Sequence, residues 1–237
     1  MRKIVVINTK GGCGKSTVAT NLAAYHAFAG FHTTLMDYDP QGSSMRWLSK
    51  RDETRPRVNG VSACERSARV TRSWQLRVPM QTERLIVDTP AGLEPQRLME
   101  ITRGAHAIVV PVLPSDIDIH AASRCIADLL LVARIDRRDE RIAVIANRAK
   151  KNTNVYRALT RFLHSLDIAF VTSLRDAQNY INCSDQGIGI HELNDNRAIR
   201  DRRDWQPLLD WIESRRPVPQ LVAGTAFSGG GNEPYGR

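Results

Sequence analysis

One stretch near the beginning of the chain limits what the sequence can fold into. Residues 4–17 read IVVINTKGGCGKST. An apolar run ends at a glycine-rich turn, and Lys15, Ser16 and Thr17 then open a helical pattern. Glycines let the backbone curl so that successive N–H groups face an anion, and the helix N-terminus behind them adds partial positive charge. The order strand, loop, helix therefore predicts a phosphate-binding loop.

This loop departs from the usual pattern G-x-x-x-x-G-K-[ST] at its first position. Thr9 stands five residues before Gly14, where the pattern has a glycine, and Lys10 adds a second cation at the mouth of the loop. We expect Lys15 to reach the outer phosphates and the Ser16 hydroxyl to bind Mg²⁺. The backbone expected to hold the phosphates is that of Gly11, Gly12, Cys13 and Gly14.

Composition places the chain among single-domain proteins. Its 237 residues suffice for one large core, and no stretch approaches the roughly 20 apolar residues of a membrane span. The apolar run after Met1 is too short for a signal peptide. Four widely spaced cysteines favour a reducing compartment over a zinc site. We therefore expect a cytoplasmic protein.

The charge points to a polyanionic partner. The formal net charge is +9, and 28 of the 34 basic residues are arginine. Arginine suits bidentate phosphate contacts. A basic face for nucleic acid or an anionic membrane fits this balance, and so does a merely solvated arginine-rich surface.

Short apolar runs alternate with helical patterns along the chain. Strands are expected at 4–7, 33–37, 57–62, 85–88, 107–111, 142–147 and 168–171. Helices are expected at 18–29, 44–50, 66–75, 95–103, 117–134, 153–166 and 195–214, with Ser115 capping the fifth. This alternation predicts a three-layer α/β fold, a mostly parallel sheet with helices on both faces. One domain would span 1–214, followed by a Pro/Gly-rich, disordered tail over 215–237.

Carboxylates stand at the ends of two predicted strands. Asp37 and Asp39 follow the second strand, and Asp88 ends the apolar run 85–88. In open α/β sheets ligands bind at the carboxyl edge, which is also where the glycine-rich loop lies. Asp88 fits a carboxylate that holds Mg²⁺, and Asp39 is placed to orient a water for attack on a γ-phosphate.

Together these motifs resemble those of the ParA/MinD family of deviant-Walker ATPases. KGGCGKST, DYDPQGS and LIVDTPAG occur in the family's order, and the resemblance covers roughly residues 3–210. It implies ATP and Mg²⁺ as cofactors, with Lys15, Ser16 and Thr17 as phosphate and Mg²⁺ ligands. Asp39 then matches the water-positioning aspartate and Asp88 the second-motif aspartate. The pair Asn147 and Arg148 resembles the family's adenine-contacting site.

The same resemblance gives Lys10 a role across a dimer. It matches the family's signature lysine, which touches the nucleotide of the partner in an ATP-sandwich dimer. The physical reason is independent of the family: Lys15 already serves its own nucleotide, so a second lysine is most useful from a neighbouring subunit. We expect an ATP-dependent homodimer and slow hydrolysis.

Three branches of the family remain distinguishable by sequence. The ParA branch binds non-specific DNA, which fits the charge and implies association with the nucleoid. A MinD-like branch needs a basic amphipathic membrane helix, which 217–237 does not provide, so no membrane is expected. The iron–sulfur branch needs cysteines in glycine-rich loops. Candidate DNA contacts are Arg175, Arg197, Arg200 and Arg203. The basic stretch 46–84 is an equal candidate, and the acids interleaved with the late arginines offer a purely structural alternative.

The resemblance leaves several cargoes open. Small ParA types move plasmids, chromosomal loci or protein organelles through an adaptor that stimulates hydrolysis, and residues 111–119 resemble carboxysome-positioning members. Two other functions stay open. One is a metabolic ATP-dependent enzyme that shares the loop, and the other is a DNA-binding dimer that uses ATP only as a switch.

Overall fold

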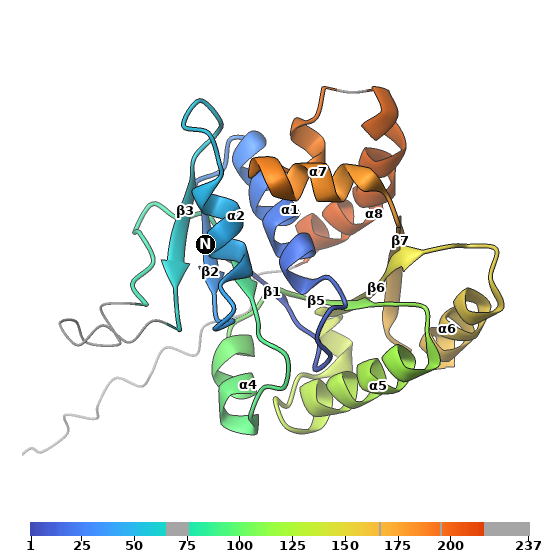
Figure 1. Cartoon of the computed structure of the whole chain (residues 1–237). Coiled ribbons are helices and arrows are strands. Elements are labelled where there is room, and N and C mark those ends of the chain that lie inside the picture. The colour runs from blue at the N-terminus through green and yellow to red at the C-terminus, as the bar shows by residue number, and fades with distance from the viewer. Residues whose placement is uncertain (65–75, 166, 195, 216–237) are drawn as a thin grey trace, which may run out of the picture.

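The computed structural model describes residues 1–64, 76–165, 167–194 and 196–215. These residues form a seven-stranded sheet in the order β3-β2-β4-β1-β5-β6-β7 (Figure 1). The strands are β1 (Arg2–Val6), β2 (Thr33–Asp37), β3 (Val58–Ser62), β4 (Arg84–Asp88), β5 (Ala107–Val112), β6 (Ile142–Ala149) and β7 (Ala169–Arg175). Every neighbouring pair of these strands is parallel. The predicted α/β class is confirmed.

Helices cover both faces of the sheet. They are α1 (Lys15–Phe28), α2 (Ser43–Ser49), α4 (Pro95–Thr102), α5 (Asp116–Leu131), α6 (Asn154–Ser165), α7 (Gln178–Gln186) and α8 (Ile199–Ser214). Helices α1, α2, α7 and α8 contribute to one apolar core, and α4, α5 and α6 to the other (Figure 1). The predicted three-layer arrangement is therefore present.

The alternation of side chains along β1 explains why there are two cores. Ile4 and Val6 belong to the core under α1, whereas Val5 and Ile7 belong to the core under α5. All four side chains are at most 2% exposed. Successive residues of a strand point to opposite faces, so a strand covered on both sides reads as a continuous apolar run.

Helix ends follow the chemistry expected from the sequence. The Ser115 hydroxyl accepts a hydrogen bond from the Asp118 N–H and caps α5, as predicted. Helix α1 ends just before Gly30, whose φ of +91° suits a glycine.

The sequence patterns did not predict helix α7, and several predicted helix ends differ from those in the structure. Helix α7 has the sequence QNYINCSDQ, in which Cys183 alone is buried. Such a segment carries almost no apolar periodicity, so its helix is set by tertiary contacts. The expected last helix begins at Ile199 after a single-turn 3-10 segment at Asn196–Ala198. The helix predicted at 66–75 lies outside the described residues, as does the predicted tail from residue 216 onward.

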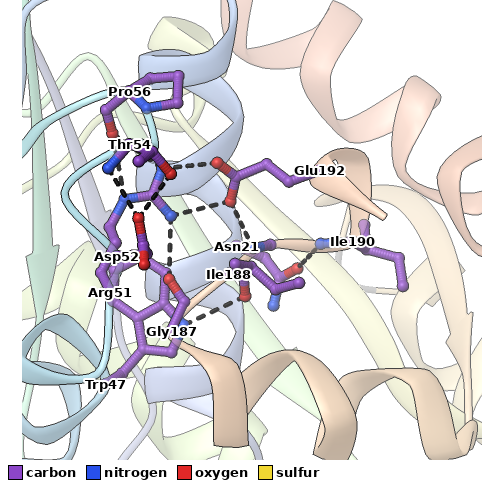
Figure 2. Close-up of polar contacts among 11 residues, drawn as sticks. Asn21, Trp47, Arg51, Asp52, Thr54, Pro56, Gly187, Ile188, Ile190 and Glu192 are labelled. Carbon is purple, nitrogen blue, oxygen red and sulfur yellow. Dashed lines mark hydrogen bonds and ion pairs between the residues drawn. The ribbon is translucent and has the colours of Figure 1, made fainter. Parts of the chain in front are cut away.

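A buried ion pair ties the end of α2 to the segment that follows α7 (Figure 2). The Arg51 guanidinium bonds Glu192 through both terminal nitrogens, at 2.6 and 2.9 Å. It also donates to the carbonyls of Pro56 and Gly187, while Glu192 accepts from the Gly189 N–H. The two side chains are 4% and 0% exposed. Both charges are thus fully partnered inside the protein.

Two further contacts fix the same segment. Trp47 Nε1 of α2 donates to the Ile188 carbonyl at 3.2 Å, and the Asn21 Oδ1 of α1 accepts from the Ile190 N–H at 2.8 Å (Figure 2). Asn21 also donates to the Thr17 carbonyl in the first turn of α1. The segment after α7 is therefore held against α1, which follows the glycine-rich loop, and against α2, which follows the Asp39 turn.

The C-terminal part of α1 contains a buried histidine. The His26 side chain is 0% exposed, and neither ring nitrogen has a hydrogen-bond partner in the described structure. Burial, together with the charges of Arg84 and Arg2, lowers the pKa of His26 to about 3. The imidazole is therefore neutral in the folded protein at neutral pH.

Candidate functional site: a phosphate-binding loop over a cavity

The glycine-rich loop connects β1 to α1 as predicted. Gly12 and Gly14 have φ of +77° and +96°, values that side chains disfavour. The Cys13 side chain is fully buried, and its thiol donates to the Lys10 carbonyl. The loop is therefore curled by its glycines, with the cysteine turned into the protein.

A cavity of about 1410 Å³ opens beside this loop. It lies at the carboxyl edge of the sheet, where Val6, Asp37 and Asp88 are in register at the ends of β1, β2 and β4. The predicted site residues that line it are Gly11, Gly12, Gly14, Lys15, Ser16, Thr17, Asp39 and Arg148. Most of the nucleotide site expected from the sequence is thus assembled around one cavity.

Lys15 and Asp88 are held in place behind the loop. Lys15 is 6% exposed, and its ammonium donates to the Lys10 carbonyl at 2.8 Å. Asp88 is fully buried and accepts a hydrogen bond from the Ser44 hydroxyl at 2.7 Å. Burial raises the pKa of Asp88 to about 7, although the hydroxyls of Ser44 and Ser16 oppose this rise.

This donor set fits Mg²⁺. The second carboxylate oxygen of Asp88, Oδ1, is buried and has no partner among the described residues. Ser16 lines the cavity, and its hydroxyl is close enough to the same carboxylate to lower the pKa of Asp88. Magnesium prefers such oxygen ligands and keeps several of its waters. When bound, the cation would neutralise charge on a polyphosphate, with Ser16 as ligand and Asp88 holding it directly or through water.

Asp37 shapes the turn that carries Asp39. Its two carboxylate oxygens accept from the Asp39 N–H at 2.9 Å and the Ser44 N–H at 3.1 Å. Asp39 accepts from the Gln41 N–H and lines the cavity. Burial raises the pKa of Asp37. Asp37 is therefore a positioning residue, while Asp39 is the carboxylate available to a ligand.

Lys10 has a partner on α5. Its ammonium lies 3.1 Å from the Asp118 carboxylate, which also accepts from the Ser115 hydroxyl. The side chains of Lys10 and Asp118 are 34% and 4% exposed. Lys10 is absent from the described lining of the cavity. The two lysines of the loop thus have different surroundings, one facing the cavity and one bound to α5.

Sequence reasoning missed other parts of the cavity wall. Tyr38, Trp47 and Arg97 line it, and the Arg97 guanidinium lies 5.2 Å from the centre of the Tyr38 ring. Ser184 of α7 lines it as well. Of these four residues, only Tyr38 could have been expected at the site from the sequence, because it stands next to Asp39. The other three belong to helices whose packing the sequence does not specify.

Asn147 and Arg148 are placed differently from each other. Arg148 is exposed and lines the cavity. Asn147 is 6% exposed and donates through Nδ2 to the Cys13 carbonyl at 2.8 Å. Of this pair, the structure therefore brings Arg148 to the cavity and Asn147 beneath the loop.

The candidate DNA contacts fall into two groups. Arg175 makes a bidentate pair with the fully buried Asp201, which Asn179 also bonds at 2.7 Å. Arg200 and Arg203 are exposed on α8. Asp201 is therefore engaged by Arg175 and Asn179. Asp201 therefore does not have the structural role of neutralising the late arginines.

Arg197 is exposed in η3 (Asn196–Ala198). The basic stretch 46–84 is only partly described, since residues 65–75 are left out. Within it, Arg51 is committed to the buried pair with Glu192. That arginine is therefore unsuited to a surface contact.

Comparison with known proteins identifies the family. Residues 4–189 match the family described as CobQ/CobB/MinD/ParA nucleotide binding domain. The chain belongs to this family. The ParA/MinD resemblance predicted from the sequence is confirmed, and with it a nucleotide-binding domain of the P-loop type.

Similar proteins extend the comparison over most of the chain. A maintenance of carboxysome distribution protein A from Halothiobacillus neapolitanus is 27% identical over 191 residues, covering 80% of this chain and 87% of the relative. The protein of the same name from Gloeobacter kilaueensis is 30% identical over 172 residues, covering 65% and 73%. The ATP complex of an aspartate-to-alanine variant of Cyanothece McdA superposes with a TM-score of 0.70 at 14% identity, covering 92% and 99%. This last likeness concerns the fold.

Within the described part of the chain, we find no helix with both the length and the apolar character to cross a bilayer.

Proposed function

We propose that the chain is a slow, Mg²⁺-dependent ATPase that dimerises around ATP and binds DNA without sequence preference in that state. It positions a cargo through an adaptor protein that stimulates hydrolysis. Hydrolysis at this site would use Lys15 and Mg²⁺ to neutralise the phosphates and Asp39 to orient the attacking water. Such a site depends on positioning and charge stabilisation, so a slow rate without the adaptor is expected.

The observation that carries this proposal is the separation of the two lysines. Lys15 faces the cavity, whereas Lys10 binds Asp118 and keeps a third of its side chain exposed. A lysine that served its own nucleotide would line the same cavity as Lys15. Lys10 is better placed to meet a second copy of the chain, as a cation supplied in trans does in other phosphoryl-transfer sites.

Support for DNA as partner comes from charge. The chain carries +9 overall, and Arg200 and Arg203 are exposed on α8. Charge of this kind attracts the phosphate backbone irrespective of sequence. We propose nucleoid association on this basis, with Arg175, Arg197, Arg200 and Arg203 as candidate contacts.

The relatives support a proposal about the cargo. Two maintenance of carboxysome distribution proteins align with most of this chain and with more than two thirds of their own length. We therefore propose that the cargo is the carboxysome. Deleting the gene in its source organism should collapse evenly spaced carboxysomes into clusters. Unchanged spacing in the deletion strain would exclude this cargo and leave the ATPase proposal standing.

The biochemical test is ATP turnover by the purified chain. Wild type should hydrolyse Mg-ATP slowly, stop when EDTA removes Mg²⁺, and respond to added DNA. Asp39→Ala should lower the rate by about 100-fold or more while ATP binding persists, in line with the usual effect of positioned acid–base groups. Asp52→Ala is the matched control, because Asp52 lies outside the described cavity lining.

Two results would contradict the proposal. One is a rate in Asp39→Ala equal to that of wild type. The other is turnover that ignores DNA but rises with a small-molecule co-substrate, which would indicate a metabolic enzyme.

A further inference from the structure

The side chain of Asn147 joins the end of β6 to the phosphate-binding loop, 134 residues away in sequence. Its Nδ2 donates to the Cys13 carbonyl at 2.8 Å, and its Oδ1 accepts from the Arg148 N–H at 3.1 Å. The residue is 6% exposed. Each end of the amide thus has one backbone partner, on one side in its own strand and on the other in the loop.

Gly14 leaves room for this contact. A Cβ built on Gly14 would lie 2.0 Å from Asn147 Nδ2, well inside any tolerated separation. Gly14 also has φ of +96°, so a side chain would be strained there in any case. The glycine is therefore needed twice, once for the turn of the backbone and once for the close approach of the amide.

The bond to the Cys13 carbonyl has a consequence for the next N–H group. In a trans peptide the C=O and the following N–H lie in one plane and point in opposite directions, and the described chain has no cis peptide bonds. Drawing the Cys13 oxygen toward Asn147 therefore turns the Gly14 N–H away from Asn147. Gly14 itself lines the cavity. A backbone donor turned away from Asn147 is thereby available to an anion in that cavity.

The rest of the loop is held by different groups. The Lys10 carbonyl accepts from the Lys15 ammonium and the Cys13 thiol, and the Lys10 N–H donates to Asn8. These contacts fix the first half of the loop. Asn147 acts on the second half, at the peptide that leads into α1.

We propose that Asn147 is a positioning residue of the phosphate-binding loop, which acts by orienting the Cys13–Gly14 peptide. This differs from the adenine contact that the family resemblance implies for it. The inference rests on the proposed nucleotide binding and assigns a specific part of it. In this arrangement Asn147 supports the polyphosphate of any nucleotide equally, and it does not choose between bases.

The test compares ligands with and without a base. Affinities of Mg-ATP, Mg-GTP and inorganic tripolyphosphate are measured by calorimetry for wild type and Asn147→Ala. A net hydrogen bond of about 0.5–1.5 kcal/mol corresponds to roughly 2- to 13-fold in affinity. Asn147→Ala should weaken all three ligands by a similar factor in this range, with the ratio of ATP to GTP affinity unchanged.

A matched control removes a buried polar group from the neighbouring strand. Ser173 is 5% exposed, pairs in register next to Ala146 and bonds the Tyr156 hydroxyl at 2.8 Å. Ser173→Ala should reduce thermal stability and leave tripolyphosphate affinity as in wild type. If Asn147→Ala fails to fold, Asn147→Asp keeps the size and the acceptor to Arg148 while removing the donor, and it should also weaken tripolyphosphate.

The outcomes separate this inference from the proposed function. If Asn147→Ala binds tripolyphosphate as wild type does but loses ATP, or if its ATP-to-GTP ratio shifts, Asn147 contacts the base and the inference is wrong. If wild type binds ATP but not tripolyphosphate, the ATP-to-GTP ratio alone decides in the same way. If wild type binds none of the three ligands, both the proposed function and this inference fail.

Discussion

The buried pair of Arg51 and Glu192 makes a quantitative prediction about stability (Figure 2). Arg51→Ala would leave the Glu192 carboxylate, 0% exposed, with only the Gly189 N–H as partner among the described residues. The change removes two charge-assisted hydrogen bonds, worth roughly 1.5–3 kcal/mol each, and those to the carbonyls of Pro56 and Gly187. Breaking a buried pair typically costs about 3–5 kcal/mol, so we expect a loss of this size in the free energy of unfolding.

The assay is urea denaturation followed by circular dichroism, without nucleotide. The double variant Arg51→Met/Glu192→Leu removes both charges and keeps similar volume, so it should recover at least half of the loss. Lys50→Ala is the control, because Lys50 at the end of α2 pairs with Asp185 of α7 at 3.7 Å and both side chains are exposed. It should cost less than about 1 kcal/mol.

Two results would refute this reasoning. One is a cost for Arg51→Ala that equals the cost for Lys50→Ala. The other is a double variant whose loss equals the summed losses of Arg51→Met and Glu192→Leu, each measured alone, to within about 0.5 kcal/mol, because independent sites behave in that way.

Two further predictions concern pH and DNA. Because the pKa of His26 is lowered to about 3, the unfolded chain binds a proton there below its ordinary pKa and the folded chain does not. The free energy of unfolding therefore includes a contribution from neutral His26 that is complete above pH 6.5. This contribution is lost at about 1.4 kcal/mol per pH unit as the pH falls below that value. His26→Leu should flatten the decline between pH 6.5 and 5 in urea titrations, and an unchanged slope would contradict it. Arg200→Glu with Arg203→Glu should weaken DNA binding and make the log–log salt dependence less steep by about 2. Arg138→Glu, at an exposed arginine in η1 (Arg137–Asp139), is the control, and equal effects would place the DNA site elsewhere.

Local patterns in the sequence were enough to predict most of the sheet. Strand β2 has the predicted limits, and Ser115 caps α5 as expected. Both depend on residues close together in the chain, where apolar periodicity and capping chemistry act directly. The loop and the Asp39 turn were predictable for the same reason, because each is a contiguous motif at the end of a strand.

Contacts between distant residues could not be predicted in this way. Arg51 and Glu192 are 141 positions apart, and Lys10 and Asp118 are 108 apart. Nothing in the composition around these residues specifies which charge meets which. Asn147 is a comparable case, because its pattern suggested a ligand contact while its packing against Gly14 depends on how β6 meets the loop.

We propose that Lys10 completes the nucleotide site of a second copy of the chain. The direct measurement is the molecular mass by light scattering in Mg-ATP and in Mg-ADP, in an Asp39→Ala background that slows hydrolysis. Asp39→Ala should be dimeric with ATP and monomeric with ADP. Adding Lys10→Ala should give monomers in both nucleotides while ATP affinity of the monomer is largely kept. A dimer that persists without the Lys10 side chain would contradict the account.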